Sequence, residues 1–197
     1  AEKDPNAKIN LSSASVLLVD GSQHSLALMA QIIKGFGVAE ISRCASIDEA
    51  EKSVRGKTFD LIVVDPDVDG GAGYSFLHAL RHSTGSTNAH VPVILVSGNA
   101  RKADVARARD TGANFFVTKP LTPNVLLQRV MFVARDKREF VEVGEYIGPS
   151  RRFKFEGLPA GEGRRNNDLQ APLGSADGPN LSQNEVDNLI KPQRVVI

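Results

Sequence analysis

The chain has 197 residues, 41% of them hydrophobic and 24% charged, a balance typical of one globular domain with an extension. Its formal net charge of +1 gives no molecule-wide field for nucleic acid, and no apolar run approaches the roughly 20 residues that span a bilayer. Residues 1–15 lack the apolar core of a signal peptide, and the one cysteine, Cys44, excludes an internal disulfide. We expect a soluble protein of the reducing cytoplasm with no membrane partner.

Apolar runs alternate with helical patterns along residues 14–138. Most of these runs are typical of strands buried on both faces, and the run at 39–43 is less apolar than the others. Helical spacing and capping signals mark the segments between the runs. A helix after each strand predicts an α/β fold with a doubly wound parallel sheet. The expected strands are 16–19, 39–43, 61–64, 91–96 and 115–117, and the expected helices are 26–36, 46–55, 74–82, 100–111 and 123–138.

Polar side chains follow these strands at their carboxyl ends, where ligands bind in such sheets. Asp20 follows the first strand, and Asp65 and Asp67 follow the third. Ser97 ends the fourth strand, and Lys119 follows the fifth. Carboxylates, a hydroxyl and an ammonium at one edge of a sheet can hold Mg²⁺ and a phosphoryl group.

These segments as a set resemble the receiver domain of two-component response regulators. The matching strings are VLLVDG with Asp20, FDLIVVD with Asp65, VPVILVSG with Ser97 and GANFFVTKP with Lys119, and the resemblance covers residues 14–138. It implies a flavodoxin-like fold whose five strands lie in the order 2-1-3-4-5. It also implies a bacterial source.

The resemblance further implies the roles of the strand-end residues. Asp65 would accept a phosphoryl group from a histidine kinase. Mg²⁺ would be bound by Asp20, by Asp65 and by the backbone carbonyl of Asp67. Lys119 would pair with the aspartyl phosphate, and Ser97 would reorient toward it.

Output in this family passes through protein contact. Phe116 stands at the position of the family's rotating aromatic switch, and the family transmits through its fourth helix, fifth strand and fifth helix, here about residues 100–138. The chain would catalyse only its own phosphorylation and dephosphorylation, so we do not expect an enzyme that acts on other substrates.

Three positions depart from the family pattern. Gly21 replaces the second acidic residue after the first strand, which predicts weaker Mg²⁺ binding unless the side chain of Asp67 or Asp69 compensates. Asp69 also replaces the usual loop proline, and Ala72 replaces the acidic residue before the loop glycine, so the loop is expected to differ in shape. The alternative function is therefore a degenerate receiver that acts as an interaction scaffold without phosphate.

A second alternative belongs to another class. The string from Asp65 to Asp67 also resembles the first motif of haloacid-dehalogenase-type phosphohydrolases, in which Asp65 would be the nucleophile and Asp67 the general acid. The strand that ends at Asp20 precedes this motif, and no strand with paired acids follows Lys119. Both facts disfavour a phosphohydrolase.

The regions outside the receiver segment are polar. Residues 1–13 and the Gly-, Pro- and Arg-rich residues 139–180 predict a flexible N-terminal segment and a flexible linker, and the C-terminal tail as a whole is expected to be largely disordered. The linker contains a basic cluster with neighbouring aromatic residues. It is either a solvated linker or a contact for a cyclic dinucleotide or nucleic acid. The basic residues are Arg151, Arg152, Arg164 and Arg165.

Residues 181–197 are expected to form a docking peptide. Ser182 and Glu185 make a capping box, and apolar residues gather on one side of the helix that follows. The string LSQNEVDNLI resembles the N-terminal peptide of the flagellar switch protein FliM, which implies docking on a receiver's output face. The docking would be to the chain's own face, to a second copy or to another receiver. The apolar residues are Leu181, Val186, Leu189 and Ile190.

Overall fold

The computed structural model describes residues 11–136, 138–151 and 181–190, except for the side chains of residues 188–190. Several expectations concern residues outside this description. They are the flexible segments at 1–10 and 152–180, the end of the docking peptide at 191–197, the contacts of Arg152, Arg164 and Arg165, and the side chains of Leu189 and Ile190.

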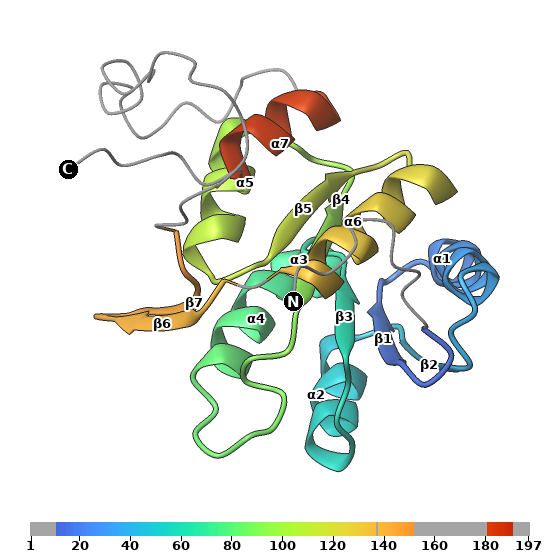
Figure 1. Ribbon diagram of the computed structural model, residues 1–197, viewed down its shortest axis with the longest axis horizontal. Helices are drawn as coiled ribbons and strands as arrows, with labels where there is room; N and C mark the ends of the chain where they lie inside the picture. Colours follow the sequence, from blue (N-terminus) through green and yellow to red (C-terminus); the bar gives the residue numbers. More distant parts are fainter. Residues whose placement is uncertain (1–10, 137, 152–180, 191–197) are drawn as a thin grey trace, which may run out of the picture.

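The main sheet has five strands in the order β2-β1-β3-β4-β5 (Figure 1). Every neighbouring pair is parallel, and in the centre Val16 of β1 lies beside Ile41 of β2 and Leu61 of β3. This confirms the expected doubly wound fold with its strand order 2-1-3-4-5. The strands are β1 (Ser15–Val19), β2 (Glu40–Cys44), β3 (Leu61–Val64), β4 (Val93–Ser97) and β5 (Phe115–Thr118).

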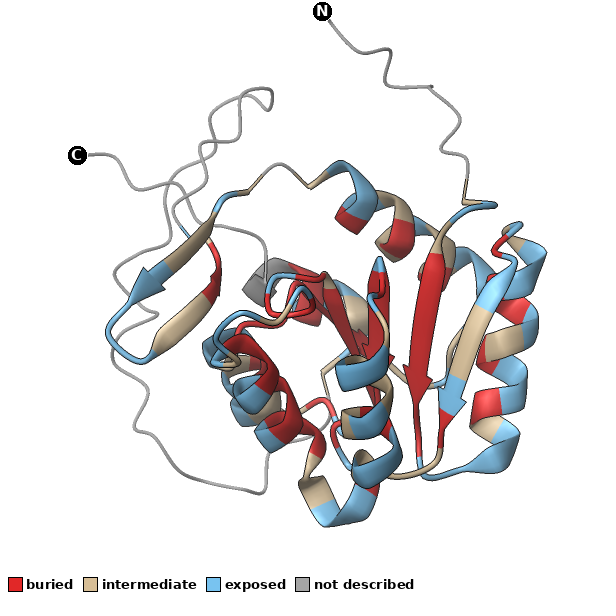
Figure 2. Cartoon of the chain, turned by 90° about the horizontal axis from the view of Figure 1, so that it is seen from below, coloured by how far each residue is buried: buried red, intermediate tan, exposed pale blue. Residues whose placement is uncertain are grey.

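Helices cover both faces of this sheet. On one face pack α1 (Gln23–Gly35) and α6 (Pro123–Arg135), and on the other pack α2 (Ile47–Gly56), α4 (Gly73–Arg81) and α5 (Lys102–Asp110). Strands β1, β3, β4 and β5 form a buried layer, the edge strand β2 is partly exposed, and the helices expose mainly their outer sides (Figure 2). Among the described residues, no helix combines the length and the apolar character needed to cross a membrane.

The central strands are continuously apolar because both of their faces are covered. Leu17 and Val19 point into the core under α2, α4 and α5, while Val16 and Leu18 point into the core under α1 and α6. All four side chains are at most 1% exposed. The alternation of strand side chains thus supplies both cores from one run of four residues.

Local capping fixes where the helices begin beside the sheet edge. Hydroxyl side chains accept the free backbone N–H groups of three first turns, and Pro123 adds its preset φ to the third. These caps place the helix starts directly after the carboxyl ends of β1, β2 and β5. The bonds run from the backbone N–H groups of Ser25, Glu49 and Val125 to the side chains of Ser22, Ser46 and Thr122.

The loop after β3 contains a short helical turn, α3 (Val68–Gly71). Asp69 and Gly70 have φ values of 49° and 74° inside it, in the left-handed region that Asp tolerates better than most residues do. This turn stands where the sequence departs from the family pattern. Because this short turn is counted as α3, the helices expected as the fourth and fifth are labelled α5 and α6. The expected output face is therefore the α5-β5-α6 face.

Residues 140–149 correct the expectation of a flexible linker from residue 139 onward. They form an antiparallel hairpin of β6 (Phe140–Val143) and β7 (Tyr146–Pro149). Gly144, with φ of 60°, makes the tight turn between the strands.

Packing against the receiver keeps this hairpin in place. The Phe140 ring lies 4.9 Å from the guanidinium carbon of Arg81 and stacks edge-on with His90. The backbones of Gly112 and Gly148 approach so closely that a Cβ on Gly148 would lie 2.8 Å from the Cα of Gly112. The contacts are tertiary, so the composition of the surrounding tail did not reveal them.

Arg81 anchors the hairpin side of the molecule. Its side chain is buried, and burial lowers its pKa to about 9, which still leaves it charged at neutral pH. Four acceptors take up its N–H groups in place of a carboxylate. They are the carbonyl oxygens of Ala89, Val91 and Gly112 and the Oδ1 atom of Asn114, at 2.8, 2.8, 3.1 and 3.2 Å.

We predict that Arg81→Met lowers the free energy of unfolding by about 3 kcal/mol, because the buried acceptors lose their donor. Urea unfolding measures this. Arg55→Met is the matched control, since Arg55 is exposed and pairs with Glu51 on the surface, so its loss should cost less than about 0.5 kcal/mol. Equal stabilities of the two variants would contradict the anchoring role.

Candidate functional site

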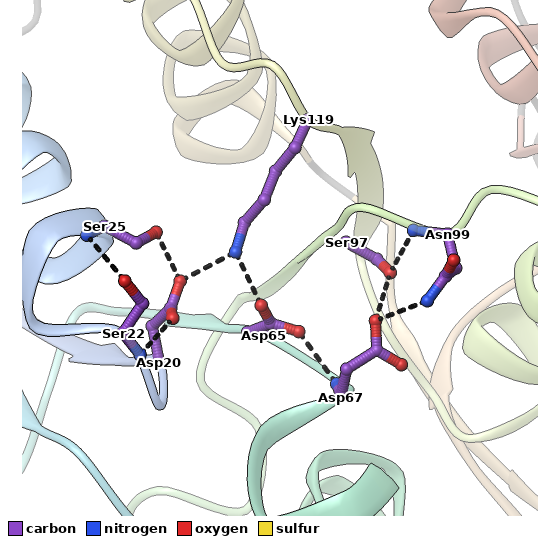
Figure 3. Close-up of polar contacts among 8 residues, drawn as sticks. All are labelled: Asp20, Ser22, Ser25, Asp65, Asp67, Ser97, Asn99 and Lys119. Atoms are coloured by element: carbon purple, nitrogen blue, oxygen red, sulfur yellow. Dashed lines mark hydrogen bonds and ion pairs between the residues drawn. The ribbon is translucent and has the colours of Figure 1, made fainter.

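The carboxyl edge of the sheet gathers the strand-end residues that the sequence singled out (Figure 3). Asp20 follows β1, Asp65 follows β3, Ser97 ends β4 and Lys119 follows β5. Asp20 is 2% exposed, Asp65 9% and Ser97 1%, so three polar groups are buried here. Side chains up to 99 positions apart in the sequence thus share one site.

Lys119 joins the two acidic strand ends. Its Nζ lies 2.8 Å from Oδ2 of Asp20 and 2.5 Å from Oδ2 of Asp65. Burial works against the charge of Lys119, but the bonds to both carboxylates outweigh it and raise the pKa of Lys119. The ammonium therefore stays protonated and offsets one of the two negative charges of the buried acids.

Asp20 is held from two sides. Its Oδ2 accepts from the Ser25 hydroxyl at 2.5 Å and from Lys119, and its Oδ1 accepts the backbone N–H of Ser22 at 2.8 Å. Burial alone would raise the pKa of Asp20, yet the bonds from Lys119, Ser25 and Ser22 lower it overall. Asp20 does not cap α1, because Ser22 takes that role. Its carboxylate is left for the site.

Asp67 turns its carboxylate toward β4, away from Asp20 (Figure 3). Its Oδ2 accepts from the Ser97 hydroxyl at 2.9 Å and from the Asn99 amide at 3.1 Å. Its backbone N–H donates to Oδ1 of Asp65 at 2.8 Å. The sequence reasoning missed Asn99 as a site residue, and its only signal was its place two positions after Ser97.

Two glycines shape the pocket in opposite ways. A Cβ on Gly73 would lie 2.7 Å from the backbone oxygen of Asp65, so the loop closes only with glycine there. A Cβ on Gly21 would meet nothing nearer than a Val68 methyl at 3.9 Å, so a side chain fits at that position. The structure therefore leaves room for the acidic residue that the sequence lacks.

The side chains of Asp67 and Asp69 do not join the carboxylate pair. Asp67 bonds to Ser97 and Asn99, and the Asp69 carboxylate accepts the first backbone N–H of α2, from Ile47, at 2.7 Å. Within the described part of the chain, no group of three or more His, Cys, Asp or Glu side chains is placed to hold a metal ion. Two carboxylates, those of Asp20 and Asp65, remain as hard oxygen ligands, and they still fit Mg²⁺, which binds proteins through one or two carboxylates.

The expected switch residue, Phe116, is fully buried in β5. Of the expected anion-binding arginines, only Arg151 is described. It pairs with Asp110 at 3.0 Å and its guanidinium lies 3.9 Å above the Tyr146 ring, so it packs on the hairpin and on the end of α5. The structure does not bring it to the site.

The expected docking peptide forms α7 (Gln183–Ile190) and lies against β5 and α5 (Figure 1). Val186 is fully buried in the core cluster beneath α2, α4 and α5, and Leu181 packs on the same cluster. The amphipathic pattern read from the sequence thus corresponds to a helix on the chain's own α5-β5-α6 face.

We predict that Lys119→Met raises the pKa of Asp20 above its ordinary value, because burial then acts without the ammonium. Carboxyl-carbon NMR titration measures this shift. In the wild type, the lowered pKa of Asp20 stabilises the fold at neutral pH, and this contribution is lost as the pH falls below about 4. In the variant the sign reverses, because an Asp20 whose pKa is raised destabilises the fold at neutral pH, and this cost should disappear as the pH falls through the raised pKa. Lys52→Met, which breaks an exposed pair with Asp48, should leave Asp20 unchanged.

Comparison with known proteins agrees with this geometry. Residues 16–131 match the family model described as the response regulator receiver domain. The chain is 27% identical over 147 residues to a protein-glutamate methylesterase/protein-glutamine glutaminase of Myxococcus xanthus, covering 74% of this chain and 41% of that protein. It is 24% identical over 115 residues to the chemotaxis protein CheY of Pseudomonas aeruginosa, covering 58% of this chain and 91% of CheY.

A similar structure is that of a putative response regulator from Chloroflexus aurantiacus, with a TM-score of 0.57 and 24% identity over 62% of this chain and 98% of that one. The likeness to that structure concerns the fold. The chain spans about two fifths of the methylesterase, so the match with that enzyme involves only part of it. The family model covers more than half of the chain, including Asp20, Asp65, Ser97 and Lys119. This chain therefore belongs to the response regulator receiver domain family of two-component signalling.

Proposed function

We propose that this chain is a response regulator that a histidine kinase phosphorylates on Asp65 with Mg²⁺, in the bacterial cytoplasm. One observation carries the proposal: the Lys119 ammonium contacts the carboxylates of Asp20 and Asp65 together, at the carboxyl edge of the sheet. An ammonium in contact with the acceptor carboxylate can pair with an arriving phosphoryl group and offset part of its negative charge, and Mg²⁺ would offset more of it.

The proposed step is a transfer between two nucleophiles. An oxygen of the Asp65 carboxylate attacks phosphorus, the P–N bond to the kinase histidine breaks, and the bond's electron pair stays on the departing imidazole. Lys119 holds its charge beside the attacking carboxylate and pairs with the phosphoryl oxygens that arrive. Asp20 and Asp65 would hold Mg²⁺ together with the Asp67 backbone carbonyl, and the metal would supply further positive charge to those oxygens.

Ser97 and Phe116 would transmit the effect of phosphorylation from the site to the output face. The Ser97 hydroxyl donates to Asp67 in the structure, 2.9 Å away. A phosphoryl group on Asp65 would compete with Asp67 for that hydroxyl, and the end of β4 would follow Ser97. The output is contact with a protein at the α5-β5-α6 face, with α7 as a docking or autoregulatory element of that face.

A specific observation favours a second function, a phosphate-independent scaffold on the same fold. Gly21 supplies no carboxylate, and Asp67 gives its carboxylate to Ser97 and Asn99. Both features weaken the case for metal binding. Because the chain belongs to the receiver family, we do not propose the phosphohydrolase alternative.

We predict that acetyl phosphate with Mg²⁺ phosphorylates the wild-type chain at one site, and that Asp65→Asn abolishes the reaction. A mobility-shift gel and intact mass measure it. Asp48→Asn is the matched control, because Asp48 is an exposed acid on α2 that contacts only Lys52 among the described residues. An unmodified wild type at saturating donor would favour the scaffold, whereas a modified Asp65→Asn would contradict Asp65 as the phosphoryl acceptor.

We also predict that Gly21→Asp tightens Mg²⁺ binding roughly tenfold, since it adds a carboxylate where a side chain fits. Isothermal titration with Mg²⁺ measures the affinity. Gly21→Asn, similar in size but uncharged, should gain much less. If both variants match the wild type, the carboxylate pair is not the metal site.

A further inference from the structure

Gln183, the first residue of α7, occupies the free edge of β5. Its Oε1 accepts the backbone N–H of Thr118 at 2.7 Å, and its Nε2 donates to the backbone oxygen of Phe116 at 3.2 Å. Since β5 is the last strand of the sheet in the part of the chain that the structure describes, no described strand pairs with these two backbone groups. One carboxamide thus satisfies the donor and the acceptor that a sixth strand would satisfy.

Asp187 adds a charged contact one helical turn later. Its Oδ2 pairs with Arg129 of α6, and its Oδ1 accepts from Nε2 of Gln183 at 2.7 Å. The two paired side chains are 10% and 15% exposed, and the Arg129 guanidinium also lies 4.7 Å from the Phe115 ring centroid. A largely buried ion pair depends on both members, because each would otherwise be a desolvated single charge.

The start of the segment is held as well. The backbone N–H of Leu181 donates to the backbone oxygen of Ala100 at 2.7 Å, and Val186 is fully buried. The surface that binds α7 therefore makes four different contacts with it. The edge of β5 binds the Gln183 carboxamide, Arg129 binds the Asp187 carboxylate, the apolar core buries Val186, and the Ala100 carbonyl accepts the backbone N–H of Leu181. Such a set selects a particular helix and not apolar character alone.

We propose that the α5-β5-α6 face is a helix-binding site whose resident ligand is the chain's own α7. Its external partner would then be an amphipathic helix with Gln near its start and Asp four residues later, which binds by displacing α7. This deepens the proposed function, resting on its assignment of output to the α5-β5-α6 face and not on the phosphorylation of Asp65.

The tether makes the competition strong. Because α7 belongs to the same chain as its binding face, its binding is intramolecular, and a covalently linked ligand can reach an effective concentration of about 1 mM. An external helix with the same intrinsic affinity is far more dilute. The external partner therefore binds weakly until α7 is loosened or the partner makes additional contacts.

The test adds a peptide of residues 181–190, labelled at its carboxyl end, to the full chain and follows fluorescence anisotropy. The variant Gln183→Ala with Asp187→Ala weakens α7 but leaves its seat intact, so we expect it to bind the peptide at least tenfold tighter than the wild type does. Asn184→Ala is the matched control, because Asn184 is an exposed neighbour on the same helix, and it should bind as weakly as the wild type.

Further arms separate masking from other effects. A peptide carrying the same two alanines should lose binding to the variant chain, and Arg129→Ala added to the variant should weaken the native peptide. The Thr118 amide should exchange with solvent faster in the variant, since its acceptor is gone. Equal peptide affinity in wild type and variant would contradict the claim that α7 masks the face. Absence of peptide binding to both chains would contradict the claim that the face is a helix-binding site. Neither outcome depends on whether Asp65 accepts phosphate.

Discussion

The contact of one ammonium with two carboxylates is the constraint on which the site depends. Asp20 and Asp65 are nearly removed from water, and two buried acids in one pocket are tolerated only with a cation between them. Lys119 meets this need because parallel strands bring all their carboxyl ends to the same edge. The ammonium that offsets part of the negative charge of the resting pocket is thus also the group that we propose to pair with an arriving phosphoryl group.

Sequence reasoning predicted the main sheet and its polar edge well, for a physical reason. Strands covered on both faces must be apolar without interruption, so the runs at 16–19 and 61–64 were readable directly. The order of the strands came from the resemblance to receivers, not from the runs themselves. Given that order, topology brings Lys119 and Asp65 to the same edge of the sheet, and the long lysine side chain reaches Asp65 across the end of β4.

The features that sequence reasoning missed depend on tertiary contacts. The hairpin at 140–149 lies in a Gly- and Pro-rich region, and only its packing on Arg81 and Gly112 explains its order. The direction of the Asp67 carboxylate was not predictable either, because it depends on a hydroxyl and an amide supplied by the next strand. The helical pattern near the carboxyl end was readable, but nothing in it revealed that Gln183 would meet the edge of β5.

The coverage of β5 has a consequence for how the molecule behaves in a crowded solution. An uncovered final strand offers its N–H and C=O groups to any extended chain, which is a common route to aggregation. Here a single side chain from a distant helix occupies those groups, so the sheet is finished without another strand. Displacement of α7 would therefore expose both a surface for a partner and the unpaired backbone groups at the edge of β5. A partner helix that binds there would cover this edge again.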